Sequence, residues 1–421
     1  MNMNHKTTNI AIVGGGMGGL ASALHLHRQG LSCDVFEATP EPHGNAVGIT
    51  LTPYVMGELS LLGVADAVQA AGIINEESVC FNRYGQFIYR EMRGRHTGFK
   101  MPEVGVHRST LHKILWNAVV ERLGQDHVHL GHRFAHMHHS DDDVTLSFTD
   151  PQGRQLPSVR ARVMLAADGV NSAVRRVFYP DEQVVFTGVN TWRGLTRRKP
   201  FLTGKSYVRL GSVDTGKMVI YPIADDVDGQ GTQLISWVAE VEQASESPND
   251  WHRRGRSQDV MPWFKNWTFD WLNVPELIQQ ADTIWQYPAV DKDPIPQWTF
   301  GRVSLLGDAA HPIYPRGANA FVQALMDART LAEEMSRCAP GDDLMPALYR
   351  YEAMRKPLSN KAVMTQRTTS SDCINIKVNE LTQGQPFRDI NEVISQAELR
   401  KISDDYKRIT GFALDTLSPT N

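Results

Sequence analysis

The segment at residues 9–38, NIAIVGGGMGGLASALHLHRQGLSCDVFEA, constrains the fold more than any other part of the chain. Its apolar run at 10–13 predicts a buried parallel strand. Gly14, Gly16 and Gly19 then form the pattern G-x-G-x-x-G, and a helical pattern and a second short strand follow. This order of elements predicts the first half of a Rossmann-like nucleotide-binding fold.

Each glycine of this pattern has its own expected role. Gly14 makes the tight turn, Gly16 lets the backbone approach a pyrophosphate, and Gly19 allows close packing of helix on strand. The helix N-terminus then faces the phosphates. Glu37, which comes 18 residues after Gly19, has the spacing of an acid that hydrogen-bonds a ribose hydroxyl. The segment predicts a dinucleotide site without deciding which dinucleotide binds.

The rest of the chain divides into regions of different pattern. Short strand-like runs separated by Gly and Asp predict an antiparallel sheet in the middle of the chain, and a strand, glycine loop and long helix return after residue 301. We therefore expect an α/β fold in three parts. These are a discontinuous nucleotide-binding domain (1–72, 101–180 and 285–350), a substrate-binding β-sheet domain (73–100 and 181–284) and a C-terminal helical segment (351–421).

Composition excludes several classes of function. The formal net charge of -4 provides no basic field for a nucleic acid, and no apolar run is long enough to predict a membrane span. The first residues lack the apolar stretch of a secretory signal, so a cytoplasmic location is expected. Cys33, Cys80, Cys338 and Cys373 lie far apart, which predicts neither a disulfide framework nor a zinc site.

A histidine-rich stretch at 127–139, HVHLGHRFAHMHH, is the other conspicuous feature. Histidines at i and i+2 on a strand share a face and can chelate a divalent metal. No cysteine completes such a site, although Asp141–Asp143 follow. Adventitious metal binding or a solvated hairpin is the favoured interpretation, and no functional metal is expected.

Two later segments extend the opening motif. LAADGVNSAVRR at 165–176 has an Asp-Gly pair at a strand end, and GRVSLLGDAAHPIYPRGANAFVQALMDARTLAEEM at 301–335 has a second one before a Pro/Gly loop and a helix. With HRSTL at 107–111 and WRG at 192–194, these segments resemble the FAD-binding motifs of the class A flavoprotein monooxygenases, the aromatic hydroxylases. Within that family the chain is similar to the branch of the salicylate and phenazine hydroxylases.

The resemblance implies non-covalent FAD as the cofactor and NAD(P)H as a transient cosubstrate. Asp308 is expected to hydrogen-bond the ribityl chain, and Asp168 to lie near the pyrophosphate. The loop 315–319 is expected beside the isoalloxazine ring. The residues that the resemblance assigns to FAD are Gly14, Gly16, Gly19, Glu37, Arg108, Asp168, Gly307, Asp308, Pro315, Gly317, Ala318 and Asn319.

The same resemblance implies a flavin-driven reaction without a catalytic side chain. By this resemblance, NAD(P)H reduces FAD, the reduced flavin reacts with O₂ to give a flavin hydroperoxide, and the distal oxygen of the hydroperoxide passes to an electron-rich ring. The protein positions the ring and excludes water. The candidate substrate contacts are Tyr221, Arg193, Tyr314, Arg316 and Phe321. Core packing for the aromatic residues, and a solvated or flavin-facing position for the arginines, are the alternatives.

The sequence therefore predicts an FAD-dependent, NAD(P)H-consuming monooxygenase of small aromatic or heteroaromatic compounds, carboxylic acids included. One alternative is an FAD oxidoreductase or epoxidase that acts on a non-aromatic substrate. Another is a flavin-binding redox sensor with slow turnover. The G-W-x-W-x-I-P signature of flavin halogenases is absent. A monomer and a homodimer both remain compatible with the sequence.

Overall fold

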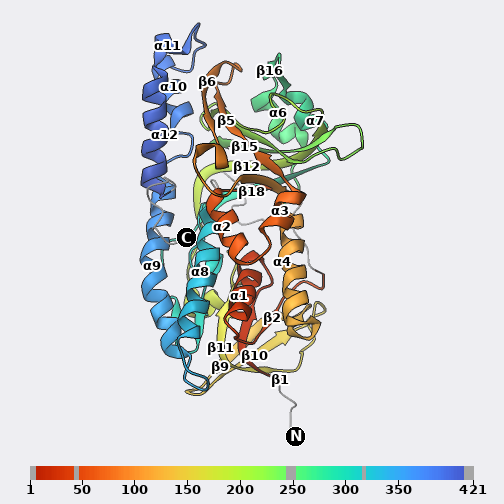
Figure 1. The fold of residues 1–421 in the computed structure, drawn as a ribbon, viewed down its shortest axis with the longest axis vertical. Helices are drawn as coiled ribbons and strands as arrows, with labels where there is room; N and C mark the ends of the chain where they lie inside the picture. The colour runs from red at the N-terminus through yellow and green to blue at the C-terminus, as the bar shows by residue number, and fades with distance from the viewer. Residues whose placement is uncertain (1–5, 42–46, 243–252, 315–318, 412–421) are drawn as a thin grey trace.

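The protein is elongated, with one large sheet in each half and the C-terminal helices along one side (Figure 1). The computed structural model describes residues 6–41, 47–242, 253–314 and 319–411. The expected α/β fold with a Rossmann-like domain, an added antiparallel sheet and a helical C-terminal segment is confirmed.

The first large sheet carries the nucleotide-binding pattern. Its strand order is β19-β20-β11-β1-β2-β8, and β10 and β9 extend it from β11. The central pairs β1–β2, β1–β11 and β11–β20 are parallel. The bounds are β1 Lys6–Val13, β2 Cys33–Phe36, β8 Val128–His129, β9 Arg133–His139, β10 Val144–Thr149, β11 Val159–Ala166, β19 Thr299–Phe300 and β20 Val303–Leu305.

Helices α1 (Met17–Arg28), α4 (Arg108–Leu123) and α8 (Asn319–Ser336) pack side by side, with α1 in contact with both others. Buried apolar residues from β1, β11, α1 and α8 form one core. A three-stranded sheet lies between this core and the second large sheet. The remaining elements here are β3 Gly48–Leu51, α2 Pro53–Leu61, α3 Ala65–Ala71, β4 Ile73–Asn75, η1 Gly94–Thr97, β7 Glu103–His107, η2 Gln125–His127, α5 Ala173–Phe178 and η3 Gly307–Ala309.

The second large sheet has seven strands in the order β18-β12-β15-β14-β13-β5-β6. All neighbours are antiparallel except β13 and β5. The bounds are β5 Glu77–Phe81, β6 Phe87–Met92, β12 Val185–Arg198, β13 Ser206–Ser212, β14 Gly216–Ala224, β15 Gln233–Glu242 and β18 Thr283–Asp291. Residues 285–291 therefore belong to this sheet, although the sequence places them in the nucleotide-binding domain.

Side chains alternate between the two faces of the second sheet, as the pleat requires. On β13, Val208 and Leu210 enter an apolar core, whereas Tyr207 and Arg209 face a cavity. The apolar face is covered by four short elements. These are α6 Ser257–Phe264, β16 Thr268–Phe269, β17 Leu272–Asn273 and α7 Val274–Gln279.

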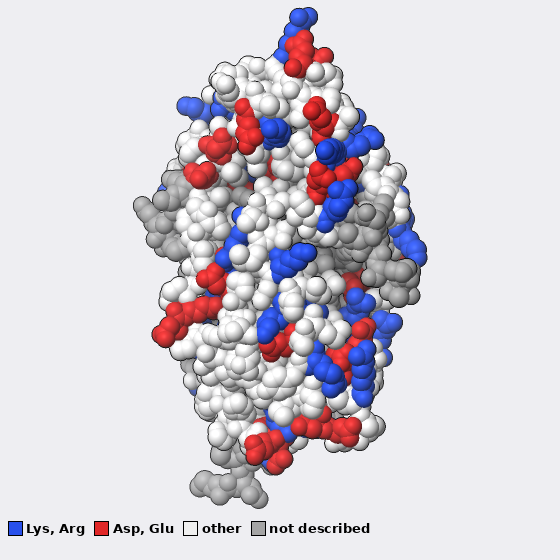
Figure 2. Space-filling model, turned by 90° about the vertical axis from the view of Figure 1, so that its left-hand side faces the viewer, with Lys and Arg blue, Asp and Glu red and all other residues white. Residues whose placement is uncertain are grey.

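The C-terminal segment connects the two halves of the molecule. Helix α9 (Met345–Thr368) packs on α8, whereas α10 (Cys373–Thr382) packs on β13, and α11 (Ile390–Val393) and α12 (Gln396–Thr410) follow. In the view of this side, basic and acidic side chains are interspersed over the surface (Figure 2). Within the described residues, no helix is both long and apolar enough to cross a membrane.

The histidine-rich stretch forms β8, β9 and their connection. His129 and Lys6 both contact the buried carboxylate of Asp34, at 2.9 and 2.7 Å. His136 and His138 lie on the largely exposed strand β9. Among the residues that the structure describes, no three potential metal ligands come together.

Candidate cofactor and substrate site

A cavity of about 940 Å³ lies between the two large sheets and is lined by all the motifs identified in the sequence. It reaches from the N-terminus of α1 to the cavity-facing side of the seven-stranded sheet. Its size is typical of sites for cofactors and small molecules. The motif residues on its wall are Gly16, Met17, Gly18, Arg108, Ala167, Gly169, Gly307, Asp308 and Phe321.

The glycine motif has the geometry that its spacing predicts. A Cβ on Gly14, whose φ is +111°, would come within 2.3 Å of the Ala167 carbonyl oxygen, and one on Gly19 within 2.0 Å of the Gly14 oxygen. A Cβ on Gly16 would meet no atom within 4 Å. Gly14 and Gly19 are therefore required for packing, whereas Gly16 opens toward the cavity.

The N-terminus of α1 provides donors at this opening. Gly16 is its N-cap and supplies no side-chain hydrogen bond, so the first N–H groups of the helix lack a capping partner from this residue. They lie beside the cavity wall formed by Gly16, Met17 and Gly18. Free N–H groups and the positive end of the helix dipole suit a pyrophosphate.

Glu37 supports the glycine turn directly. Its carboxylate accepts hydrogen bonds from the backbone N–H of Gly15 at 2.7 Å and from the N–H and hydroxyl of Thr39 at 2.8 and 2.9 Å. It is not among the residues that line the cavity. Its hydrogen bond to a ribose hydroxyl stays a prediction.

Asp168 caps helix α5 and does not itself line the cavity. Its carboxylate accepts from the Ser172 hydroxyl at 2.5 Å and from the N–H groups of Ala173 and Val174 at 2.7 and 3.1 Å. Its neighbours Ala167 and Gly169 are on the cavity wall. The segment thus reaches the cavity with its backbone, and the Asp168 side chain fixes that backbone.

The surroundings of Asp308 show whether the cavity can hold the ribityl chain of FAD. Its side chain lines the cavity, and no hydrogen bond to it is present in the described part of the chain. Burial raises the pKa of Asp308, and the charges of His311 and Arg108 oppose that rise. A carboxylate that faces a cavity with unused acceptor sites suits a polyhydroxyl chain. The donor set therefore fits the ribityl part of FAD.

A buried cluster behind the cavity holds the loop that carries Asp308. The Asp327 carboxylate, on α8, accepts from the Gly307 N–H at 3.0 Å and from the Arg355 guanidinium at 2.8 Å, and lies 2.5 Å from His311 Nε2. Burial alone would raise the pKa of Asp327, but the charges of His311 and Arg355 hold it below its usual value. Asp327 thus joins the cofactor loop to α9.

The predicted substrate contacts divide into three groups. Tyr221, Arg193 and Phe321 line the cavity, and the Arg193 guanidinium lies 5.9 Å from the ring centre of Tyr287. Tyr314 is buried in a small apolar cluster and is not on the cavity wall. Arg316 lies outside the described part of the chain. Of the residues predicted beside the isoalloxazine ring of FAD, Asn319 begins α8 and is buried, whereas Pro315, Gly317 and Ala318 lie outside the described residues.

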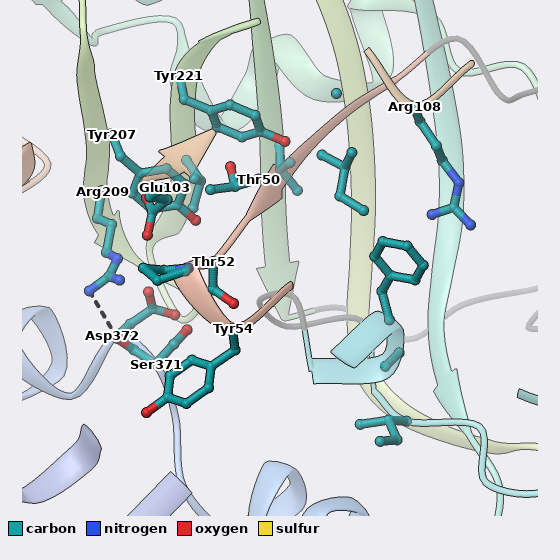
Figure 3. Close-up of a pocket in the computed structure, with 18 of the residues that line it drawn as sticks. Thr50, Thr52, Tyr54, Glu103, Arg108, Tyr207, Arg209, Tyr221, Ser371 and Asp372 are labelled. Carbon is teal, nitrogen blue, oxygen red and sulfur yellow. Dashed lines mark hydrogen bonds between the residues drawn. The ribbon is translucent and has the colours of Figure 1, made fainter. Parts of the chain in front are cut away.

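The residues on the far side of the cavity belong to none of the motifs identified in the sequence. Figure 3 shows Tyr207, Arg209 and Asp372 on one side, Arg108 on the other and Tyr221 between them. Tyr207 and Tyr221 are stacked, with ring centres 5.3 Å apart. The alternation in SYVRL marks Tyr207 and Arg209 as one face of a strand, but only the fold shows which face meets the cavity.

A family model described as FAD binding domain matches residues 7–250 and 279–366. The chain belongs to the FAD binding domain family. The match covers all three cofactor motifs of this flavoprotein, and it ends before the helices α10 to α12.

Relatives of this flavoprotein share most of its length. It is 36% identical to the phenazine 1,6-dicarboxylic acid hydroxylase PhzS of Lysobacter antibioticus, over 86% of this chain and 89% of that protein. It is 28% identical to the 3-hydroxybenzoate 6-hydroxylase of Polaromonas naphthalenivorans, over 87% and 88%. The crystal structure of Klebsiella pneumoniae HpxO complexed with FAD and uric acid has a TM-score of 0.74 at 22% identity, over 97% and 96% of the two chains.

The cofactor and the reaction class predicted from the sequence are confirmed. The flavoprotein uses FAD, and it is a monooxygenase of the class A aromatic hydroxylases. The fold is also similar to that of a salicylate hydroxylase substrate complex, with a TM-score of 0.70 at 21% identity over 99% of both chains. The alternatives, an epoxidase of non-aromatic compounds and a redox sensor, lose their support.

Proposed function

We propose that this flavoprotein hydroxylates a planar aromatic carboxylic acid in the cytoplasm, with NAD(P)H as reductant and O₂ as oxidant. The observation that carries the proposal is that one continuous cavity is lined both by Asp308 and by the stacked rings of Tyr207 and Tyr221. Flat aromatic rings pack well against such a stack. The relatives named for phenazine dicarboxylate and hydroxybenzoate support an acidic substrate.

We assign different residues of the cavity wall to the cofactor and to the substrate. The backbone at Gly16 and Gly307 and the Asp308 carboxylate line the cavity, and we assign them to hold FAD, which would supply the redox chemistry and the activation of O₂ when bound. Arg193 is the candidate partner for the substrate carboxylate near the cofactor. A cation at that position fixes the ring in one orientation, which raises the rate by positioning.

The chain also excludes water from the substrate ring. Val219 and Val238 provide apolar surface on the cavity-facing side of the sheet, and Tyr221 is only 4% exposed. Burial raises the pKa of Tyr221, so that its hydroxyl stays neutral and can donate a hydrogen bond. The described cysteines are all free, which supports a reducing compartment.

The test is oxidation of NADH and of NADPH by the purified, FAD-loaded protein against benzoate, pyridine and phenazine carboxylic acids. We expect one class of acid to stimulate oxidation and to gain one oxygen atom, detected by mass spectrometry. Stimulation without oxygenated product, or equal stimulation by non-aromatic acids, would refute the proposal. The preference between NADH and NADPH follows from the same experiment.

A further inference from the structure

The cavity has a second end, away from the cofactor motifs, which we call the far lobe. Its wall includes Tyr207 and Arg209 from β13 and Ser371 and Asp372 from the turn between α9 and α10 (Figure 3). Lys217 from β14 also lines the cavity. Ser371 and Asp372 lie beyond residue 366, where the match to the family model ends. The far lobe is therefore closed by a part of this chain that the family model does not describe.

Most cations of the far lobe already have a carboxylate partner. The ion pairs are Arg93–Glu103 at 3.1 Å, Lys217–Glu240 at 2.5 Å, Lys217–Asp372 at 2.6 Å and Lys407–Glu91 at 2.7 Å. Of these pairs, Lys217–Asp372 joins the start of α10 to the sheet, and Lys407–Glu91 joins α12 to it. Buried charges paired in this way are costly to separate, so these cations are not available to a ligand.

Arg209 differs from these cations. Its guanidinium donates one hydrogen bond, to the Ser371 carbonyl oxygen at 3.3 Å, and lies 5.5 Å from the ring centre of Tyr207. The described residues form no ion pair with Arg209, and the charges of Asp372 and Glu91 act on it only from a greater distance. A guanidinium carries five N–H donors in a planar fork. Arg209 thus brings unused donors and a positive charge to the cavity wall.

The aromatic side chains between Arg209 and the cofactor side of the cavity suit a flat ring system. Tyr207 and Tyr221 stack at 5.3 Å with an angle of 22° between their planes. Tyr54 and Phe99, which also line the cavity, meet edge to face at 5.6 Å. Burial raises the pKa of Tyr207 to about 12, so its ring carries no negative charge that would repel an anion.

We propose that the far lobe binds a second carboxylate of an extended, polycyclic aromatic substrate, and that Arg209 is the residue that recognises it. The inference rests on the proposed function and narrows it to a diacid whose acidic groups lie at opposite ends of a fused ring. A planar carboxylate matches the guanidinium fork in a bidentate hydrogen bond.

The test compares two ligands of one ring system, phenazine-1,6-dicarboxylate and phenazine-1-carboxylate, on the FAD-loaded protein. Binding is followed by the change in flavin absorbance without reductant, and KM and kcat by product formation. A hydrogen bond between charged groups contributes about 1.5–3 kcal/mol, which corresponds to about a 10- to 150-fold change. We expect Arg209→Met to raise the Kd and the KM for the diacid by that factor. The Kd and the KM for the monoacid should rise less than about threefold.

Arg197→Met is the matched control, because Arg197 lies on β12 of the same sheet but is 57% exposed and pairs with Asp282. It should leave both ligands unaffected. Arg209→Lys keeps the charge without the fork and should restore part of the diacid affinity, which separates recognition from a folding defect. Equal losses for both acids in Arg209→Met, or no binding of the diacid to the wild type, overturn the inference. Absence of oxygenated product with every acid instead refutes the proposed function.

Discussion

Replacing Asp327 by asparagine tests how the cofactor loop is held. Asp327 is completely buried, and its two oxygens receive the Gly307 N–H, His311 and Arg355. Asparagine has the same shape, but one of its two terminal atoms is an NH₂ donor. In the folded protein this NH₂ group must face either the guanidinium of Arg355 or the N–H groups of Gly307 and His311. All of these groups are donors, so one hydrogen bond is lost.

The expected loss follows from the charge that the substitution leaves behind. Arg355 is 2% exposed, and removing one partner of a buried ion pair costs about 3–5 kcal/mol. We expect Asp327→Asn to lower the free energy of unfolding by that amount. FAD affinity should fall as well, because Gly307 and Asp308 are in the loop that Asp327 fixes.

Urea unfolding of the apoprotein and FAD titration by fluorescence quenching measure the two effects. Asp405→Asn is the control, since Asp405 forms an ion pair with Arg408 in which the two side chains are 46% and 61% exposed, and such pairs contribute at most about 1 kcal/mol. A loss in Asp327→Asn no larger than in the control, with unchanged FAD affinity, would show that the cluster does not hold the loop.

Three further predictions concern the cofactor and pH. Asp308→Ala should weaken FAD binding about 10- to 150-fold, as expected for a lost charged hydrogen bond; full flavin content after dialysis would contradict this. Gly19→Ala should abolish flavin retention because its Cβ would lie 2.0 Å from the Gly14 oxygen, whereas Gly57→Ala, in open space on α2, should not. Burial lowers the pKa of His25 from 6.5 to about 4, so protonation favours the unfolded chain and the wild type should lose up to about 3 kcal/mol as the pH falls from 6.5 to 4. His25→Leu should remove that part of the loss in urea unfolding, and parallel pH profiles would refute the assignment.

The cofactor side of the cavity could be predicted because its signals are local in sequence. The strand, glycine turn and helix at residues 9–38 require a close approach that few other residues permit, and the distances at Gly14 and Gly19 bear this out. Asp308 follows a strand end in the same way. The sequence signal of each of these residues is local, although Gly14 packs on Ala167 and Asp327 holds the loop of Asp308 in the folded protein.

The far lobe could not be predicted, because its residues meet through long-range packing. Arg209 and Ser371 are 162 positions apart, and neither lies in a recognisable motif. Asp327 has a local signal in the sequence, because it is an acid on the mostly apolar face of the α8 helix between Ala324 and Ala328. An acid at such a position implies a buried partner.

The division of the cavity wall has an evolutionary consequence. The cofactor side is built from motifs that lie within residues 7–366, whereas Ser371 and Asp372 close the far lobe from a segment outside that region. Mutations after residue 368 can therefore change which acids are accepted while the oxidation chemistry is inherited unchanged. We expect the sequences of homologues with different substrates to differ most in this segment. Exchanging residues 369–411 between two such homologues should also exchange their substrate preference.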